Sequence, residues 1–192
     1  VFRVLCIVGF KGECALKLGL SRDEVVLVPF QTQWKAEFEK VKAALIKHTT
    51  LQATQIEHIG STAINGIHAK PVIDILVGVK HLETLEKSFF KDLQKVGFYR
   101  LRVERPDEIV CAKFTDETFE TKTHFIHIVE WHGKKWRELL FFRDYLNKNE
   151  SVRLQYEALK TSFFETNLNG INDYTNYKEQ FVQSIFAKME GN

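Results

Sequence analysis

The segment HIGSTAINGIHAKPVIDILV, residues 58–77, holds the residue types best suited to chemistry. The turn at Gly60 and Ser61, followed by Thr62, offers hydroxyl and backbone N–H groups that can hold a phosphate. Asp74 stands in an apolar run, where a lone buried carboxylate is costly unless it is paired, hydrogen-bonded or bound to a metal. Magnesium would satisfy Asp74 and bridge it to phosphate oxygens. The alternative is a common turn and an aspartate that only caps a neighbouring loop.

Two basic residues could reach such a phosphate. Lys70 precedes Pro71, which holds it extended, so its ammonium could contact a phosphate or an acidic substrate. It could also be a solvated loop lysine. Arg143 shares one face of an expected helix with apolar residues, a poor place for an idle charge. It could pair with Asp74, Glu130 or a ligand phosphate, or anchor the C-terminal helices through an internal ion pair.

Histidines flank the same segment. His58 precedes the turn, and His124 and His127 lie on one expected strand. Residues three apart in a strand point to opposite faces, so only one of His124 and His127 can face the site directly. The histidines could contact a phosphate, act as a general base or serve structure alone.

The elements that must position these residues form an α+β pattern, because period-two and period-3.6 segments are mixed and the last third is helical. The expected helices cover residues 32–48, 81–96, 134–146, 152–164 and 174–189. The expected strands cover residues 55–59, 72–79, 98–103, 109–114 and 124–130. We therefore predict one mixed β-sheet with flanking helices and a helical C-terminal third.

The composition is that of an ordinary soluble globular protein: 192 residues, 44% hydrophobic and 27% charged. The formal net charge is only +2, so there is no strong nucleic-acid signal. Cys6, Cys14 and Cys111 are too scattered for a disulfide framework or a paired zinc motif. Reduced thiols and a cytoplasmic location are the expectation.

The first ten residues are apolar but too short to cross a bilayer, which takes ~20 apolar residues in a helix. We expect no membrane span, and an N-terminal arm or extra strand over residues 1–16. The main domain then covers residues 17–190, with the sheet at about 17–131 and the C-terminal helices at about 133–190.

The motifs GST at 60–62, KP at 70–71 and ID at 73–74, followed by FRDYL at 142–146, resemble the signature of the GrpB family. The resemblance covers roughly residues 17–187. It implies a nucleotidyltransferase-like fold, grouped with the DNA polymerase beta-like enzymes. In that superfamily a Gly-Ser turn holds a nucleoside triphosphate, and carboxylates on the following strands hold divalent metal.

The sequence departs from that pattern at the acidic positions. The mate of Asp74 would fall at Val72 or Leu76, which are apolar, and the third acidic position would fall near His127. Two-metal phosphoryl transfer normally needs several carboxylates to hold the metals. The family's strand motif favours His127 over His124, so His58, Asp74 and His127 could hold a metal as a facial triad.

Three functions follow from these residues. The first is a divergent nucleotidyltransferase that moves a nucleoside monophosphate from a nucleoside triphosphate to an acceptor, with magnesium at Asp74. The second is a non-catalytic module for a nucleotide or other phosphorylated ligand on the same fold, and the third is a metal-dependent hydrolase that uses the histidine–aspartate triad. The expected phosphate-binding residues are Gly60, Ser61, Thr62 and Arg143. The expected catalytic residues are Asp74, His127 and Lys70.

Overall fold

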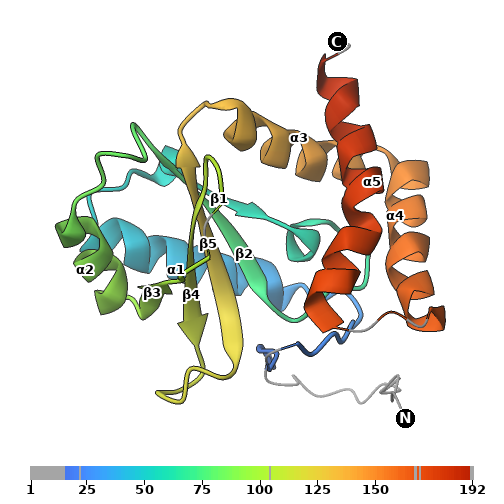
Figure 1. Ribbon diagram of the computed structural model, residues 1–192, viewed down its shortest axis with the longest axis horizontal. Coiled ribbons are helices and arrows are strands. Elements are labelled where there is room, and N and C mark those ends of the chain that lie inside the picture. Colours follow the sequence, from blue (N-terminus) through green and yellow to red (C-terminus); the bar gives the residue numbers. More distant parts are fainter. Residues whose placement is uncertain (1–15, 22, 104, 167, 169, 191–192) are drawn as a thin grey trace.

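The computed structural model describes residues 16–190 except 22, 104, 167 and 169, and in these residues a single sheet is flanked by helices (Figure 1). The strands are β1 (Ile56–Ile59), β2 (Ile73–Val79), β3 (Phe98–Arg100), β4 (Ile109–Phe114) and β5 (Lys122–Glu130). The helices are α1 (Gln33–His48), α2 (Lys87–Lys95), α3 (Lys134–Lys148), α4 (Glu150–Ser162) and α5 (Gly170–Glu190). The expected α+β architecture, with flanking helices and a helical C-terminal third, is confirmed.

The sheet is mixed, with strand order β1-β2-β5-β4-β3. Strands β2 and β5 are parallel, whereas each of the other neighbouring pairs is antiparallel. Asp74 pairs with Phe125 and Leu76 pairs with His127, so these four side chains lie on one face. Ile75, between them in β2, points to the opposite face.

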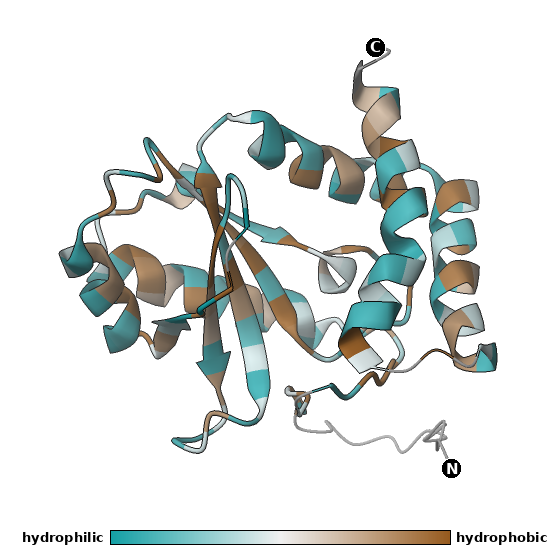
Figure 2. Cartoon of the chain, in the orientation of Figure 1, coloured by the Kyte–Doolittle hydropathy of each residue, from teal (hydrophilic) through white to brown (hydrophobic). Residues whose placement is uncertain are grey.

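The face that includes Ile75 packs against α1 and α2 and forms the larger core. Apolar residues of α1 recur at helical spacing, and Trp34 and Leu45 are fully buried against the sheet. Each large apolar side chain buried in this way contributes about 1.5–3 kcal/mol to folding. Figure 2 shows the apolar residues running along the central strands β2 and β5.

The opposite face is covered by the C-terminal helices. Trp136 of α3 packs on Ile59 and Leu76. Ile64 and Ile67, from the loop between β1 and β2, are buried among α3, α4 and α5. The loop after the Gly60–Ser61 turn is therefore held between the sheet and the helical third.

Several expected boundaries were wrong. The helix expected over 81–96 begins only at Lys87, because Leu82 and Leu85 reach the core from a turn that precedes it. The strand expected over 98–103 ends at Arg100, where its ladder with β4 ends. The last helix begins at Gly170 rather than 174.

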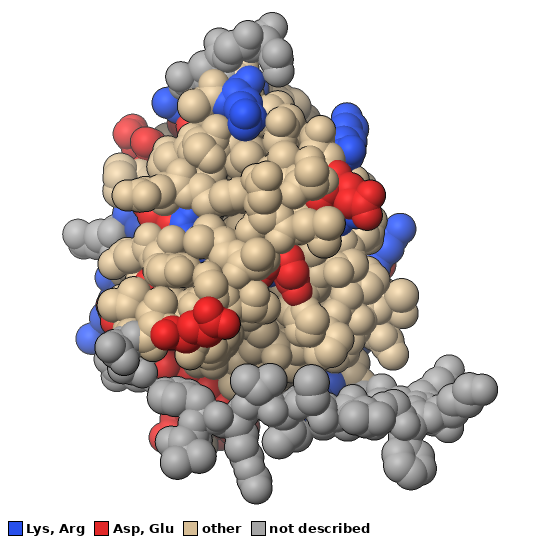
Figure 3. Space-filling view, turned by 90° about the vertical axis from the view of Figure 1, so that its right-hand side faces the viewer, with Lys and Arg blue, Asp and Glu red and all other residues tan. Residues whose placement is uncertain are grey.

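The surface and the termini add little to the functional assignment. No helix in the described ranges is both long and apolar enough to cross a bilayer. The side of the molecule shown in Figure 3 carries scattered charges of both signs outside its grey atoms. Cys111 is buried and free, whereas Cys6, Cys14 and the expected arm up to residue 15 lie outside the described residues.

Candidate functional site

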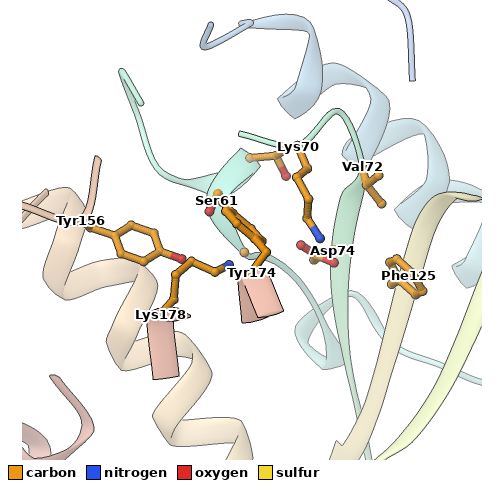
Figure 4. Close-up of a pocket in the computed structure, with 10 residues that line it drawn as sticks. Ser61, Lys70, Val72, Asp74, Phe125, Tyr156, Tyr174 and Lys178 are labelled. Carbon is orange, nitrogen blue, oxygen red and sulfur yellow. The ribbon is translucent and has the colours of Figure 1, made fainter. Parts of the chain in front are cut away.

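A pocket of about 140 Å³ lies between the sheet and the C-terminal helices (Figure 4). The Gly60–Ser61 turn, the end of the following loop at Lys70, and Asp74 of β2 line one side. Tyr156 of α4 and two residues of α5, Tyr174 and Lys178, line the other. The structure therefore brings the predicted turn, lysine and aspartate together, and adds residues from the last third of the chain.

The turn approaches Asp74 because residue 60 is a glycine. Gly60 has φ 71° and ψ −174°, a combination that is essentially restricted to glycine. A β-carbon there would stand 2.2 Å from Oδ2 of Asp74, so no other residue fits without a shift. Ser61 lines the pocket and hydrogen-bonds Tyr156. The backbone of the turn is thus placed directly against the carboxylate.

Thr62 also lines the pocket, but its hydroxyl group is engaged elsewhere. Its Oγ1 is 2.9 Å from Nε2 of His58, and the residue is buried. His58 points to the α1 side of the sheet, where its ring stacks on Phe38 with centroids 4.8 Å apart. Burial lowers the pKa of His58 to about 4, so this imidazole is neutral near pH 7. His58 and Thr62 form a structural support beneath the turn.

Asp74 belongs to a carboxylate–imidazole–carboxylate chain. Its Oδ1 is 3.5 Å from Nε2 of His127, whose Nδ1 bonds to Glu108. Burial alone would disfavour the charged imidazole, but hydrogen bonds to both carboxylates raise the pKa of His127 to about 9. Despite its own burial, Glu108 has its pKa lowered to about 2 by His127 and Arg105. The chain therefore carries a cation between two anions at neutral pH.

Two lysines bring positive charge into the pocket. Burial lowers the pKa of Lys70 and of Lys178 to about 8 each, and Lys178 further lowers that of Lys70 by repulsion. The ammonium of Lys178 lies 4.0 Å from the ring centroid of Tyr174, and that of Lys70 lies 5.6 Å from the same centroid. Figure 4 shows Lys70 directed toward Asp74. Among the described residues, neither lysine has a carboxylate within ion-pair distance.

The loop that carries Lys70 is clamped by α4. The backbone N–H of His68 donates to Oε2 of Glu157 at 3.0 Å, and its carbonyl accepts from Lys160. Lys160 is fully buried and also lies 3.3 Å from Glu157. Both backbone polar groups of His68 are thus satisfied by one helix, which fixes the approach of Lys70 two residues later.

Arg143 and Glu130 do not line the pocket. Arg143 bonds to Glu57 and to Asp144, each at 2.7 Å, and to the carbonyl of His58. This is the internal ion pair that the sequence left open, and it ties α3 to β1. Glu57 of β1 is therefore held by an ion pair with α3. Glu130 lies at the other end of β5 and faces His81 at 3.9 Å.

A metal at Asp74 would find few partners among the residues present. The strand register places His58 on the face opposite Asp74 and His127, so the hypothesised triad is not assembled. Within the described ranges, no group of three or more His, Cys, Asp or Glu residues is arranged to hold a metal ion. Asp74 is also the only carboxylate among the described residues that line this pocket. This donor set does not fit a two-metal centre.

Sequence reasoning gave too little weight to four residues. No role was predicted for Tyr156, Tyr174 or Lys178, although the i, i+4 spacing of Tyr174 and Lys178 places both on one face of α5. No role was predicted for Glu108 either. Strand alternation places Glu108 on the same face as Val110, which pairs with His127, but that pairing follows from the strand order and not from a local pattern.

Comparison with known proteins decides the family. Residues 24–188 match the family model described as GrpB protein. The chain belongs to the GrpB family. It is 46% identical to the glutamate-rich protein GrpB of Alkalihalophilus pseudofirmus over 173 residues, 90% of this chain and 99% of that protein. This confirms the predicted family.

Two solved structures are also similar to this GrpB-family chain. The conserved protein GrpB from Enterococcus faecalis superposes with a TM-score of 0.69 and 24% identity, over 85% of this chain and 96% of that one. The two chains therefore share a fold. The Cid1 poly(U) polymerase matches with a TM-score of 0.46 and 13% identity, over 78% of this chain and 49% of that chain. A likeness this distant carries no argument about activity.

Proposed function

We propose that this GrpB-family protein binds a nucleotide or another phosphorylated small molecule in the pocket between the sheet and α5. The observation that carries the proposal is the meeting of Lys70 and Lys178 in one half-buried cavity. Each ammonium is partly desolvated, as its lowered pKa reflects, and an anion between the two would relieve that cost. Charge-assisted contacts of this kind are the strong ones in proteins.

The Gly60–Ser61 turn supports the same proposal. Its backbone can approach a ligand closely because Gly60 has no side chain, and Ser61 places a hydroxyl at the pocket. Tyr174 lies beneath both ammonium groups and holds them over its ring. The lining thus combines donors for phosphate oxygens with an aromatic floor.

Binding is tested by thermal melting with AMP, ATP and inorganic phosphate. A bound ligand raises the melting temperature by mass action. Lys178→Met should weaken binding roughly tenfold or more, the effect of losing one charge-assisted hydrogen bond. Lys188→Met, an exposed lysine on the same helix, is the matched control and should bind as the wild type does. Equal affinity in both variants would place the ligand elsewhere.

Nucleotidyl transfer is the second candidate. The observation that favours it is the close approach of Gly60 to the carboxylate of Asp74, which brings together the turn expected to hold the triphosphate and the residue expected to hold magnesium. The measurement is pyrophosphate release from each of the four nucleoside triphosphates in the presence of magnesium. Asp74→Ala should abolish release. Release that persists in the Asp74→Ala variant would show that another site, or another protein in the preparation, is responsible.

A further inference from the structure

We propose that the pocket holds the terminal phosphate of a phosphomonoester by side-chain cations alone, without a divalent metal. The inference rests on the proposed function and gives it a ligand class. It also differs from what the superfamily resemblance implies, because there the phosphates are held through metal ions on several carboxylates.

The first observation is that the carboxylates needed for metal are absent or already used. Val72, directly before β2, and Leu76 within it stand two residues on either side of Asp74, and both are buried and apolar. Glu108, on the same face of the sheet, is bonded to His127 and Arg105. One carboxylate therefore remains for the pocket.

The second observation concerns the two oxygens of Asp74. Oδ1 faces Nε2 of His127 at 3.5 Å, and Oδ2 packs directly against Gly60. Magnesium demands near-ideal octahedral geometry at about 2.0–2.1 Å and retains several waters. A carboxylate flanked by an imidazole and a backbone offers little room for such a shell.

The third observation is that positive charge is already in place. Lys70 comes from the loop before β2 and Lys178 from the middle of α5, and both line the cavity. Asp74 lines it too, and His127 lies beside Asp74. Two ammonium groups match the charge of a phosphate dianion. A divalent cation in the same small space would instead be repelled by both lysines.

The size of the cavity narrows the ligand class. Its volume is about 140 Å³. Pockets that enclose a whole drug-sized ligand are larger, about 300–1,000 Å³. The cavity therefore suits one phosphate group, with the rest of the ligand outside it. A terminal phosphomonoester meets that requirement.

The test is a calorimetric titration of the full chain with AMP and with inorganic phosphate, once in excess EDTA and once in excess magnesium chloride. The expected affinities are equal in the two buffers. Binding that is more than about tenfold tighter with magnesium would overturn the inference and leave the proposed function intact. If neither probe binds in either buffer, the proposed function fails as well.

A second variant separates the two models by the sign of its effect. Asp74→Asn keeps the shape of the side chain and removes its charge. If lysines alone hold the phosphate, the substitution removes a repulsion, so AMP should bind equally or severalfold more tightly in EDTA. If a metal on Asp74 holds the phosphate, the same substitution should weaken binding in magnesium. Circular dichroism checks that the variant is folded. If the folded variant binds AMP more weakly than the wild type in EDTA, the inference is overturned.

Discussion

The two faces of the sheet are built from the same strands but by different rules. On the α1 side, β2 contributes Ile73, Ile75 and Val77, which are fully buried in one apolar cluster. On the α5 side, the same strand contributes Asp74, whose buried charge is offset by His127 and Lys70. The first face is apolar throughout this stretch, whereas the second combines an apolar cluster around Leu76 with unlike charges around a cavity. We therefore expect substitutions of the apolar residues on the first face to change stability, and substitutions of the pocket residues on the second face to change binding.

The largest expected effect breaks the apolar face. Ile75→Ala should lower the free energy of unfolding by about 2–5 kcal/mol, because it removes buried methyl groups and leaves a cavity. Chemical denaturation measures this loss. Ile46→Ala is the control, since Ile46 lies on α1 but is 39% exposed, and it should cost much less. Below its melting temperature, Ile75→Ala should still bind AMP. Loss of AMP binding by the folded variant would contradict the separation of the two faces.

The next effect tests the contact between the turn and Asp74 by a matched pair of glycines. Gly60 and Gly66 both have positive φ, at 71° and 76°. A β-carbon at Gly66 meets nothing within 4 Å, so Gly66→Ala should cost only backbone strain, about 1–2 kcal/mol. Gly60→Ala adds a clash with the carboxylate of Asp74, so it should cost about 1–3 kcal/mol more and abolish binding. If the two substitutions lowered the free energy of unfolding equally and both variants still bound AMP, the turn would be free to move away from Asp74.

The same division explains what the sequence could predict. The run VIDILVGV and the helical spacing of Trp34, Phe38, Val41 and Leu45 predict β2 and α1, because burial on that side depends on local periodicity alone. The pairing of Glu108 with His127 depends on strand order and register, which no local pattern specifies. Lys178 reaches the pocket only because α5 folds back over the loop before β2. No local pattern in the sequence predicts either contact.

The smallest expected effect is the stability cost of burying a charge in the pocket. Whether the charge of Lys178 lowers or raises the stability of the fold distinguishes the pocket from the apolar face. Burial lowers the pKa of Lys178 to about 8 from its ordinary value of 10.5. Between these pH values the unfolded chain binds more protons, so the stability of the wild type rises with pH relative to a variant without this lysine. Lys178→Met should therefore be more stable than the wild type at pH 7, by about 1–2 kcal/mol after allowance for partial exposure. The difference should shrink as the pH rises from 8 to 10.5, which chemical denaturation across that range measures. A Lys178→Met variant that is less stable than the wild type at pH 7 would show that the ammonium stabilises the fold through Tyr174. Lys178 would then contribute to stability, as the residues of the apolar face do.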